Sequence, residues 1–171
     1  MKSLIKILLI SLLFASCSKK VVFTSSMQEE YKFSEDRLKK VQFYTSSQII
    51  LFKIKQEGDV SVSDGKVLFK NKKDVEKIII PKNTKCILEE VLDKSKYLFS
   101  FELVDGRVLV FGNNGSGCYS LMAKNWKDGA GIIEYANKTY VTTNGNVFLN
   151  IKAKNLKQLK GKERVIHGRK V

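Results

Sequence analysis

The chain has 171 residues, which is enough for one domain or for two very small β modules that share a core. Hydrophobic residues make up 43% and aromatic residues 10% of the chain, so a disordered protein is excluded. Lys and Arg number 31 against 17 Asp and Glu, and the formal charge of +14 points to anionic partners. One His and three scattered Cys cannot form a zinc cluster, and we expect neither metal nor cofactor.

The first seventeen residues, MKSLIKILLISLLFASC, predict a targeting signal. Lys2 and Lys6 form a positive start, and residues 7–14 form a short apolar run. This run is too short to cross a hydrocarbon core, because such a helix needs about 20 residues. We therefore expect residues 1–16 to be a signal peptide that is removed from the mature protein.

Cys17 directly follows two small residues, Ala15 and Ser16. The stretch LFASC resembles the lipobox of bacterial lipoproteins, in which the Cys thiol is acylated and becomes the new N-terminus, although Phe14 stands where Leu is usual. This resemblance implies a membrane anchor at Cys17, whereas the alternative is an ordinary signal peptide cut near a Cys. By the sorting rule for such lipoproteins, Ser18 in place of an Asp favours the outer membrane over the inner membrane. Lys19 and Lys20 lack the acidic tag associated with surface export, which favours the periplasmic face.

The mature chain divides into three parts by composition. Residues 17–33 are polar with scattered aromatics and are interpreted as a tether. Ser34, followed by two acidic residues, predicts the start of a short helix. We expect a β-rich domain over residues 34–160 and a basic tail over residues 161–171.

Stretches rich in aromatic and β-branched residues predict strands within the β-rich domain. The first are residues 41–44 and 48–55, and Pro81 is expected to end a later strand at a sheet edge. Apolar residues alternate from Tyr97 to Leu103, which predicts one face of a longer strand.

Turn-forming dipeptides separate these strands. Residues 64–65 (DG), 105–106 (DG) and 144–145 (NG) each lie between two strand-like stretches, and a further hairpin is expected around residues 137–138. The glycine-rich residues 112–117 are interpreted as a hairpin loop, because no helix signal follows them as in a phosphate-binding loop. Together these signals predict an all-β fold, either a small antiparallel barrel or a compact sandwich.

Four stretches, LKKVQFYTSSQIIL, IIIPKNTKC, FGNNGSGCYSLMAKNW and GIIEYANKTYVTT, carry a resemblance to a known family. They resemble small envelope lipoproteins of Bacteroidota built from SH3-like β-barrels, over about residues 34–171. The resemblance implies one or two SH3-like barrels and an envelope location. Cys86 departs from the family pattern, in which Pro-Gly often follows the preceding Thr. The family has no defined activity, so no catalytic residue is transferred.

Cys86 and Cys118 are the two thiols that remain once Cys17 is acylated. In an oxidising periplasm they could form a disulfide worth about 3 kcal/mol. The alternative is two separate thiols that act as small apolar side chains, since sequence cannot show the distance between them.

Trp126 and a run of basic residues are the candidate contact residues. Trp126 lies beside two lysines and a DG turn, where it could anchor a partner or close one end of the domain. The basic candidates lie near the C-terminus and are Lys157, Lys160, Lys162 and Arg164. Such a run attracts lipid head groups, lipopolysaccharide phosphates or acidic protein surfaces in the periplasm, and we expect no nucleic acid there. The alternative is that these lysines only solvate the surface.

These observations predict a non-catalytic, lipid-anchored docking module of the cell envelope. The alternative function is a binder of a cell-wall glycan or of a lipopolysaccharide-like anionic ligand, with a cleft lined by Trp126, Tyr119 and Tyr135. An enzyme is disfavoured because His167 lies in the basic tail, far in sequence from either thiol.

The anchor has a direct test. We expect a Cys17→Ser variant to lose incorporation of a labelled fatty acid, because the thiol is the acylated group. Cys118→Ser serves as the control and should retain the label. A Cys17→Ser protein that still takes up the label would refute the anchor.

Overall fold

The computed structural model of the chain describes residues 19–53, 60–63, 66–69 and 76–159. The fold is mostly β, with 51% strand and 13% helix, arranged in two antiparallel sheets and a separate hairpin. The all-β prediction is therefore confirmed. The expected signal peptide and the basic tail lie outside the described residues.

The larger sheet has seven strands. In their order across the sheet they are β1 (Lys20–Val22), β14 (Leu149–Lys152), β2 (Phe43–Thr45), β7 (Lys85–Asp93), β8 (Lys96–Ser100), β9 (Val108–Asn113) and β10 (Tyr119–Leu121). Isolated bridges from Thr24 to Cys118 and from Ser120 to Phe148 bring the β10 edge back toward the first strands. Since these contacts are single bridges, the sheet curls strongly but is not the closed barrel that was predicted as one alternative.

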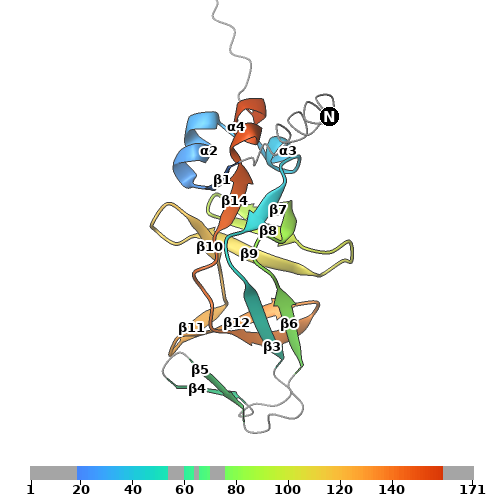
Figure 1. Cartoon of the computed structure of the whole chain (residues 1–171), viewed down its shortest axis with the longest axis vertical. Coiled ribbons are helices and arrows are strands. Elements are labelled where there is room, and N and C mark those ends of the chain that lie inside the picture. The colour runs from blue at the N-terminus through green and yellow to red at the C-terminus, as the bar shows by residue number, and fades with distance from the viewer. Residues whose placement is uncertain (1–18, 54–59, 64–65, 70–75, 160–171) are drawn as a thin grey trace, which may run out of the picture.

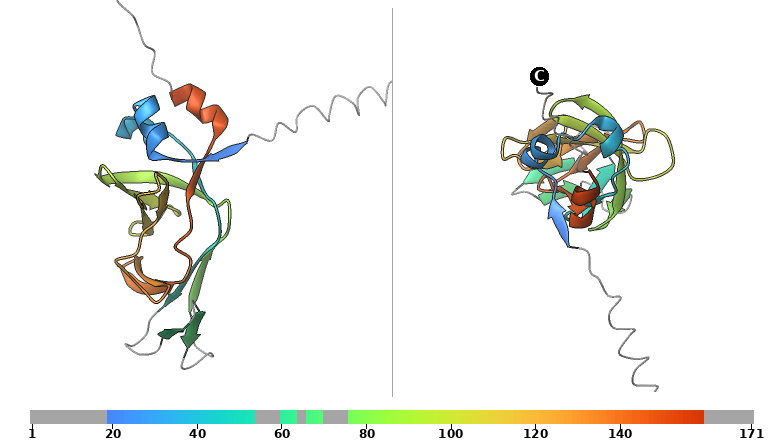
Figure 2. Two further views of the ribbon diagram at one scale, coloured as in Figure 1. Left: turned by 90° about the vertical axis from the view of Figure 1, so that its left-hand side faces the viewer. Right: turned by 90° about the horizontal axis from the view of Figure 1, so that it is seen from above.

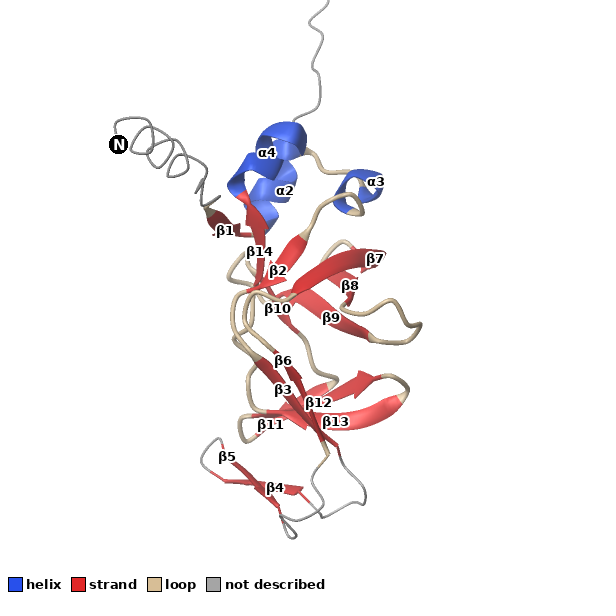
Figure 3. Ribbon diagram, turned by 45° about the vertical axis from the view of Figure 1, so that its right-hand side comes forward, coloured by secondary structure: helices blue, strands red, loops and turns tan. Residues whose placement is uncertain are grey.

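The smaller sheet has five strands at the other end of the molecule (Figures 1 and 3). They are, in order, β11 (Asn125–Lys127), β12 (Ala130–Tyr135), β13 (Lys138–Thr142), β3 (Ile49–Lys53) and β6 (Lys77–Ile80). A hairpin of β4 (Val60–Ser63) and β5 (Lys66–Phe69) lies beyond this sheet. Strand β6 ends directly before Pro81 at the sheet edge, as predicted.

Three short helices gather at the end of the larger sheet: α2 (Ser25–Tyr31), α3 (Glu35–Leu38) and α4 (Ala153–Leu159) (Figure 2). The Thr24 hydroxyl caps α2 by accepting from the Met27 amide at 3.2 Å. The predicted helix after Ser34 is confirmed as α3, although the Ser34 side chain makes no capping hydrogen bond.

The interpretation of residues 17–33 as a tether is wrong for the part that the structure describes. Phe23 is 1% exposed, and its ring stacks on Tyr119 with centroids 5.0 Å apart. Phe33 also belongs to the core, and β1 pairs in register with β14. The aromatic residues of this stretch therefore belong to the core, and α2 exposes Glu29 and Glu30 while Gln28 is partly buried.

The predicted hairpins have different outcomes. The β12–β13 hairpin is confirmed, and its turn places Ala136 and Asn137 at positive φ, as a tight hairpin turn requires. The β4–β5 pairing is confirmed, while its turn at residues 64–65 lies outside the described residues. The β9–β10 hairpin at the glycine-rich loop is confirmed as well.

The β8–β9 hairpin exists, but its connection is longer than predicted. Strand β8 ends at Ser100, and Leu103 is fully exposed rather than part of the alternating face. The loop departs from the sheet because the Ser100 hydroxyl donates to the Glu102 carbonyl at 2.7 Å and the Ala136 amide donates to the Gly106 carbonyl at 2.9 Å.

The prediction of a hairpin at residues 144–145 is wrong. Strand β13 belongs to the smaller sheet and β14 to the larger one, so this segment crosses between sheets. Gly145 is needed there for space, because a Cβ atom would lie 2.7 Å from Cη2 of Trp126.

The chain passes between the two sheets at four described connections, β2–β3, β6–β7, β10–β11 and β13–β14. Thr45, which is fully buried, joins the first two of these connections. Its hydroxyl donates to the Pro81 carbonyl at 3.0 Å and accepts from the Thr84 amide at 3.1 Å. Its own amide donates to the Thr84 carbonyl at 3.1 Å. We call this crossing region the waist.

One hydrophobic cluster extends through both sheets. Phe43 lies at its centre in the larger sheet, with edge-to-face contacts to Phe23 and Phe99. Ile49 and Tyr140 belong to the same cluster in the smaller sheet. The two sheets therefore share one core.

The waist generates a prediction about stability. Thr45→Val keeps the shape of the side chain but removes the hydroxyl, so the Thr84 amide loses one acceptor in a buried place. We expect a loss of about 1–2 kcal/mol in the free energy of unfolding, measured by urea denaturation. Thr139→Val, at an exposed position of β13, is the matched control and should change stability by less than about 0.5 kcal/mol. Equal effects of the two substitutions would contradict this role of Thr45.

Candidate functional site

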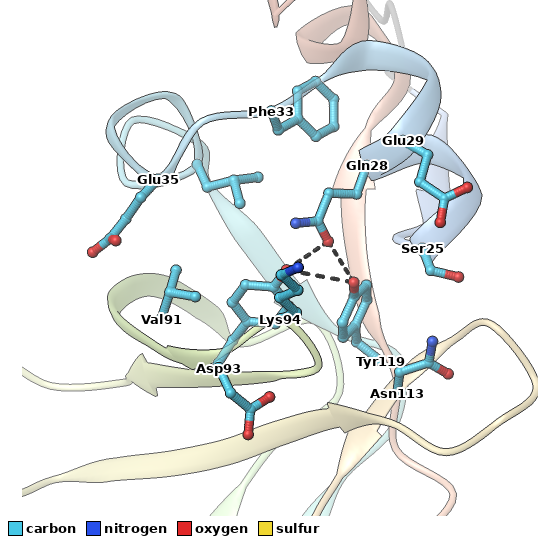
Figure 4. Close-up of a pocket in the computed structure, with 12 residues that line it drawn as sticks. Ser25, Gln28, Glu29, Phe33, Glu35, Val91, Asp93, Lys94, Asn113 and Tyr119 are labelled. Carbon is cyan, nitrogen blue, oxygen red and sulfur yellow. Dashed lines mark hydrogen bonds between the residues drawn. The ribbon is translucent and has the colours of Figure 1, made fainter.

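A cleft of about 640 Å³ opens at the helical end of the molecule. Helices α2 and α3 form one side, and the β7–β8 turn with the start of the β9–β10 loop forms the other (Figure 4). Phe33, Leu38 and Val91 supply its apolar wall. Ser25, Gln28 and Asn113 contribute polar groups, so the cleft has a mixed lining.

Two buried tyrosines and one glutamine form the floor of the cleft. Tyr97 donates its hydroxyl hydrogen to Oε1 of Gln28 at 2.5 Å, and Tyr119 donates to the same oxygen (Figure 4). Both rings are 1% exposed, and they meet edge to face with centroids 4.8 Å apart. Burial, together with the Tyr97 hydroxyl, raises the pKa of Tyr119 well above its usual value. The Tyr119 hydroxyl is therefore a stable donor at neutral pH, and the floor is rigid.

The rim of the cleft carries charges of both signs, with carboxylates in excess. Glu29, Glu35, Asp93 and Lys94 all line it. Asp93 accepts from the hydroxyl and the amide of Ser95, both at 2.7 Å, and these hydrogen bonds lower its pKa. Glu35 also pairs with Lys39 at 2.7 Å and Asp93 with Lys96 at 3.7 Å, so the rim of the cleft is a surface of mixed charge.

The glycine-rich loop is ordered against α2 rather than open for a phosphate. Oδ1 of Asn113 accepts from the Gly115 amide at 3.0 Å and from the Gly117 amide at 3.3 Å. The Gly117 carbonyl accepts from the Ser25 amide at 2.8 Å. The loop amides are thus used within the loop itself, which agrees with the prediction of a hairpin loop.

The structure shows Cys86 and Cys118 as free cysteines, which corresponds to the second alternative and not to a disulfide. Cys86 is 2% exposed in the core, opposite Phe43, and burial raises the pKa of its thiol far above the usual value. Cys118 is partly buried, and its backbone forms an isolated antiparallel β-bridge with that of Thr24. Cys86 therefore acts as a small apolar side chain.

Trp126 does not line the cleft but lies in edge strand β11 of the smaller sheet. Its side chain is 41% exposed, and the inner edge of the indole packs against Gly131 and Gly145. Tyr135 is 2% exposed in the core. The prediction that Trp126, Tyr119 and Tyr135 line one cleft is therefore wrong, because only Tyr119 reaches the cleft that the structure forms.

The remaining predicted site residues are not tested by the structure. Cys17, Lys160, Lys162 and Arg164 lie outside the described residues. Lys157 is part of α4, but its side chain is not described.

Sequence analysis missed the residues of α2 that form the cleft, above all Gln28. They belong to the stretch that was interpreted as a tether. A signal was present, because Thr24 and two serines are typical N-cap residues before MQEEY. Phe23 and Phe33, which flank this segment, marked it as part of a core.

A second polar cluster lies where the β8–β9 loop meets β12. The Tyr135 hydroxyl donates to Oε1 of Glu102 at 2.9 Å, and Arg107 forms an ion pair with the other carboxylate oxygen. The hydrogen bond from Tyr135 and the one from Arg107 lower the pKa of Glu102. This cluster attaches the loop to the smaller sheet.

Comparison with models of protein families, with curated proteins and with solved structures finds no match to this chain. Within the described residues, no helix is long and apolar enough to span a membrane. The same part of the chain contains no group of three His, Cys, Asp or Glu side chains that could hold a metal ion.

The Glu102 cluster predicts a pH dependence of stability. Because folding lowers the pKa of Glu102, its contribution is present above the unfolded pKa and is lost as the pH falls through the folded value. We expect Glu102→Gln to be less stable than wild type at pH 7 and the difference to vanish in acid, as measured by thermal unfolding across pH. Glu89→Gln, at an exposed position of β7, is the control and should show no such trend. A difference between wild type and Glu102→Gln that persists at low pH would contradict the assignment.

Proposed function

We propose that the chain is a lipoprotein of the cell envelope that is anchored through acylated Cys17 to the periplasmic face of the outer membrane. It acts as a non-catalytic docking module, and the SH3-like character of residues 34–171 is part of this proposal. The strong curl of the larger sheet supports the proposed SH3-like character, since the β10 edge of the sheet returns toward β1 and β14.

The observation that carries the proposal is the preformed cleft lined by α2 and α3 (Figure 4). Its floor is held by the hydrogen bonds among Gln28, Tyr97 and Tyr119. An apolar wall with a rim of mixed charge gives both affinity and orientation to a segment of a partner protein. Such a cleft binds without rearrangement, so little conformational entropy is lost.

The polar groups of the cleft support binding more than catalysis. Asp93 is held by Ser95, Glu35 pairs with Lys39 at 2.7 Å, and both tyrosine hydroxyls donate to Gln28. A general base needs a free lone pair directed at a substrate proton. These groups are instead engaged with their neighbours, which suits a rigid contact surface.

One observation favours a second candidate, a binder of a cell-wall glycan. The cleft volume of about 640 Å³ lies within the range of small-molecule sites. Hydroxyl, carboxamide and carboxylate groups line it, and these are groups that bind sugar hydroxyls.

In-cell photo-cross-linking separates the two candidates. We expect a photoreactive residue at Lys94, on the cleft rim, to capture one recurrent envelope protein that remains after a high-salt wash. The same residue at Lys138, in the smaller sheet, is the control and should not capture it. Capture from both positions, or from neither, would contradict docking at the cleft.

The glycan candidate is tested on the purified protein. A ligand that binds only the folded state raises the melting temperature. A rise with soluble cell-wall fragments, abolished by Gln28→Ala, would favour the glycan binder, whereas the docking proposal expects no shift.

A further inference from the structure

The outer side of the larger sheet carries a second surface, made of residues that do not line the cleft. In β1, β14, β2 and β7, alternate residues point away from the core. The register aligns Lys20 with Lys152, and it aligns Val22, Asn150, Tyr44 and Lys85 in a neighbouring row. On the inner side of the same strands, Ile151, Phe43 and Cys86 are buried and Val21 is partly buried. We call the outward surface of Lys20, Lys85, Lys152, Tyr44, Val22 and Ile87 the basic face.

Tyr44 organises the lysines of the basic face. The Nζ of Lys20 lies 4.1 Å from the centroid of the Tyr44 ring, and that of Lys152 lies 5.6 Å from it. Tyr44 is only 5% exposed, so these side chains cover it. Lys20 also donates to Oδ1 of Asn83 at 2.9 Å. The ring attracts both ammonium groups and holds their positive charges close together.

The charge of the basic face is not neutralised by carboxylates. Within the described part of the chain, the ion pairs all involve other cations, and none involves Lys20, Lys85 or Lys152. The first carboxylate along the outward side of β7 is Glu89, beyond Ile87. The face therefore combines concentrated positive charge with a broad sheet surface.

Two apolar side chains accompany these lysines. Val22 is 36% exposed and Ile87 is 43% exposed, and both point to the same side of the sheet as the lysines. Apolar side chains beside cationic ones fit the boundary between lipid head groups and acyl chains. Lysine, as a flexible point charge, suits a fluid array of phosphates better than a single shaped partner.

The position of Cys17 in the chain indicates that the membrane lies next to the basic face. Lys20 is the third residue after Cys17, and a fully extended chain spans at most about 3.6 Å per residue, so the two lie within about 11 Å of each other. The attraction between charges in physiological salt decays over a Debye length of about 8 Å, so a lysine must lie close to the head groups to be attracted by them. The Ala153 amide donates to the Lys19 carbonyl at 2.9 Å, which fixes the start of β1 to β14. An acyl group at Cys17 would therefore leave the domain next to the membrane surface.

From these observations we infer that the basic face lies on the anionic phospholipid head groups of the leaflet that holds the acyl anchor. This inference rests on the proposed anchoring at Cys17 and adds an orientation to it. The larger sheet contacts the membrane through β1, β14, β2 and β7, and the domain does not hang freely from its anchor.

The first test uses the acylated protein in phosphatidylcholine vesicles, with or without phosphatidylglycerol. A membrane-impermeant amine reagent, read out residue by residue by mass spectrometry, reports the exposure of each lysine. On phosphatidylglycerol vesicles we expect the reactivity of Lys20, Lys85 and Lys152 to fall about tenfold and to recover in high salt. Lys77, Lys127 and Lys138, in the smaller sheet, should not change. Equal reactivity of the basic face on both kinds of vesicle would overturn the inference.

The second test separates the face from the anchor. All described core residues lie at or after Phe23, so a chain that begins at residue 17 contains the whole core. Such a chain with Cys17→Ser should still sediment with phosphatidylglycerol vesicles. Replacement of Lys20, Lys85 and Lys152 by Gln should weaken this binding about a hundredfold, since each lysine near an anionic surface contributes about 1 kcal/mol.

Matched variants complete the design. Replacement of Lys77, Lys127 and Lys138 by Gln changes the net charge equally and should leave the binding within about twofold, because the local field and not the total charge decides it. Arg at the three face positions should retain the binding, and thermal melting checks that each variant is folded. If both Gln triples weaken binding equally, the face is refuted. If Cys17→Ser keeps fatty-acid labelling in cells while the face still binds, the anchor is refuted and the face remains.

Discussion

The buried contacts of Thr45 at the waist are the constraint on which the rest of the structure depends. The connection between β2 and β3 meets the one between β6 and β7 there, and the Thr45 hydroxyl serves both Pro81 and Thr84. The nearby Phe148 amide donates to the Ser46 hydroxyl at 2.7 Å, which adds the approach to β14. Each sheet contains strands that the chain reaches only by passing through these connections. Neither sheet can therefore form completely unless the connections at the waist are in place.

Strand β2 shows how this constraint also positions the two candidate surfaces. Three consecutive residues have three tasks: Phe43 fills the core, Tyr44 holds the lysines of the basic face, and Thr45 joins the crossing segments. The alternation of a strand makes this division possible, since neighbouring side chains point to opposite sides. A shift of one residue in the β2 register would turn Tyr44 toward the core and Phe43 toward the outer side of the sheet. The core and the basic face therefore depend on one register.

Charge is distributed unevenly over this basic chain. The rim of the cleft combines carboxylates with cations, because Glu35 pairs with Lys39 and Asp93 pairs with Lys96. Lysines without ion-pair partners in the described structure gather on the basic face. A cationic surface together with a cleft of mixed charge favours a defined orientation between an anionic surface and a second partner. The proposed anchor and the proposed docking cleft are compatible in this way, because they use separate surfaces.

The sequence by itself determined the features that depend on local backbone preferences. The β12–β13 turn, the end of β6 before Pro81, the helix after Ser34 and the all-β class were all predicted, because φ/ψ limits and alternation act over a few residues. Only the tertiary structure decided which strands pair and which side chains meet. Residues 144–145 form a crossing because β13 and β14 pair in different sheets, and Gln28 forms the floor of a cleft because two tyrosines from distant strands donate to it. Such contacts join residues far apart in the chain, and no local pattern encodes them.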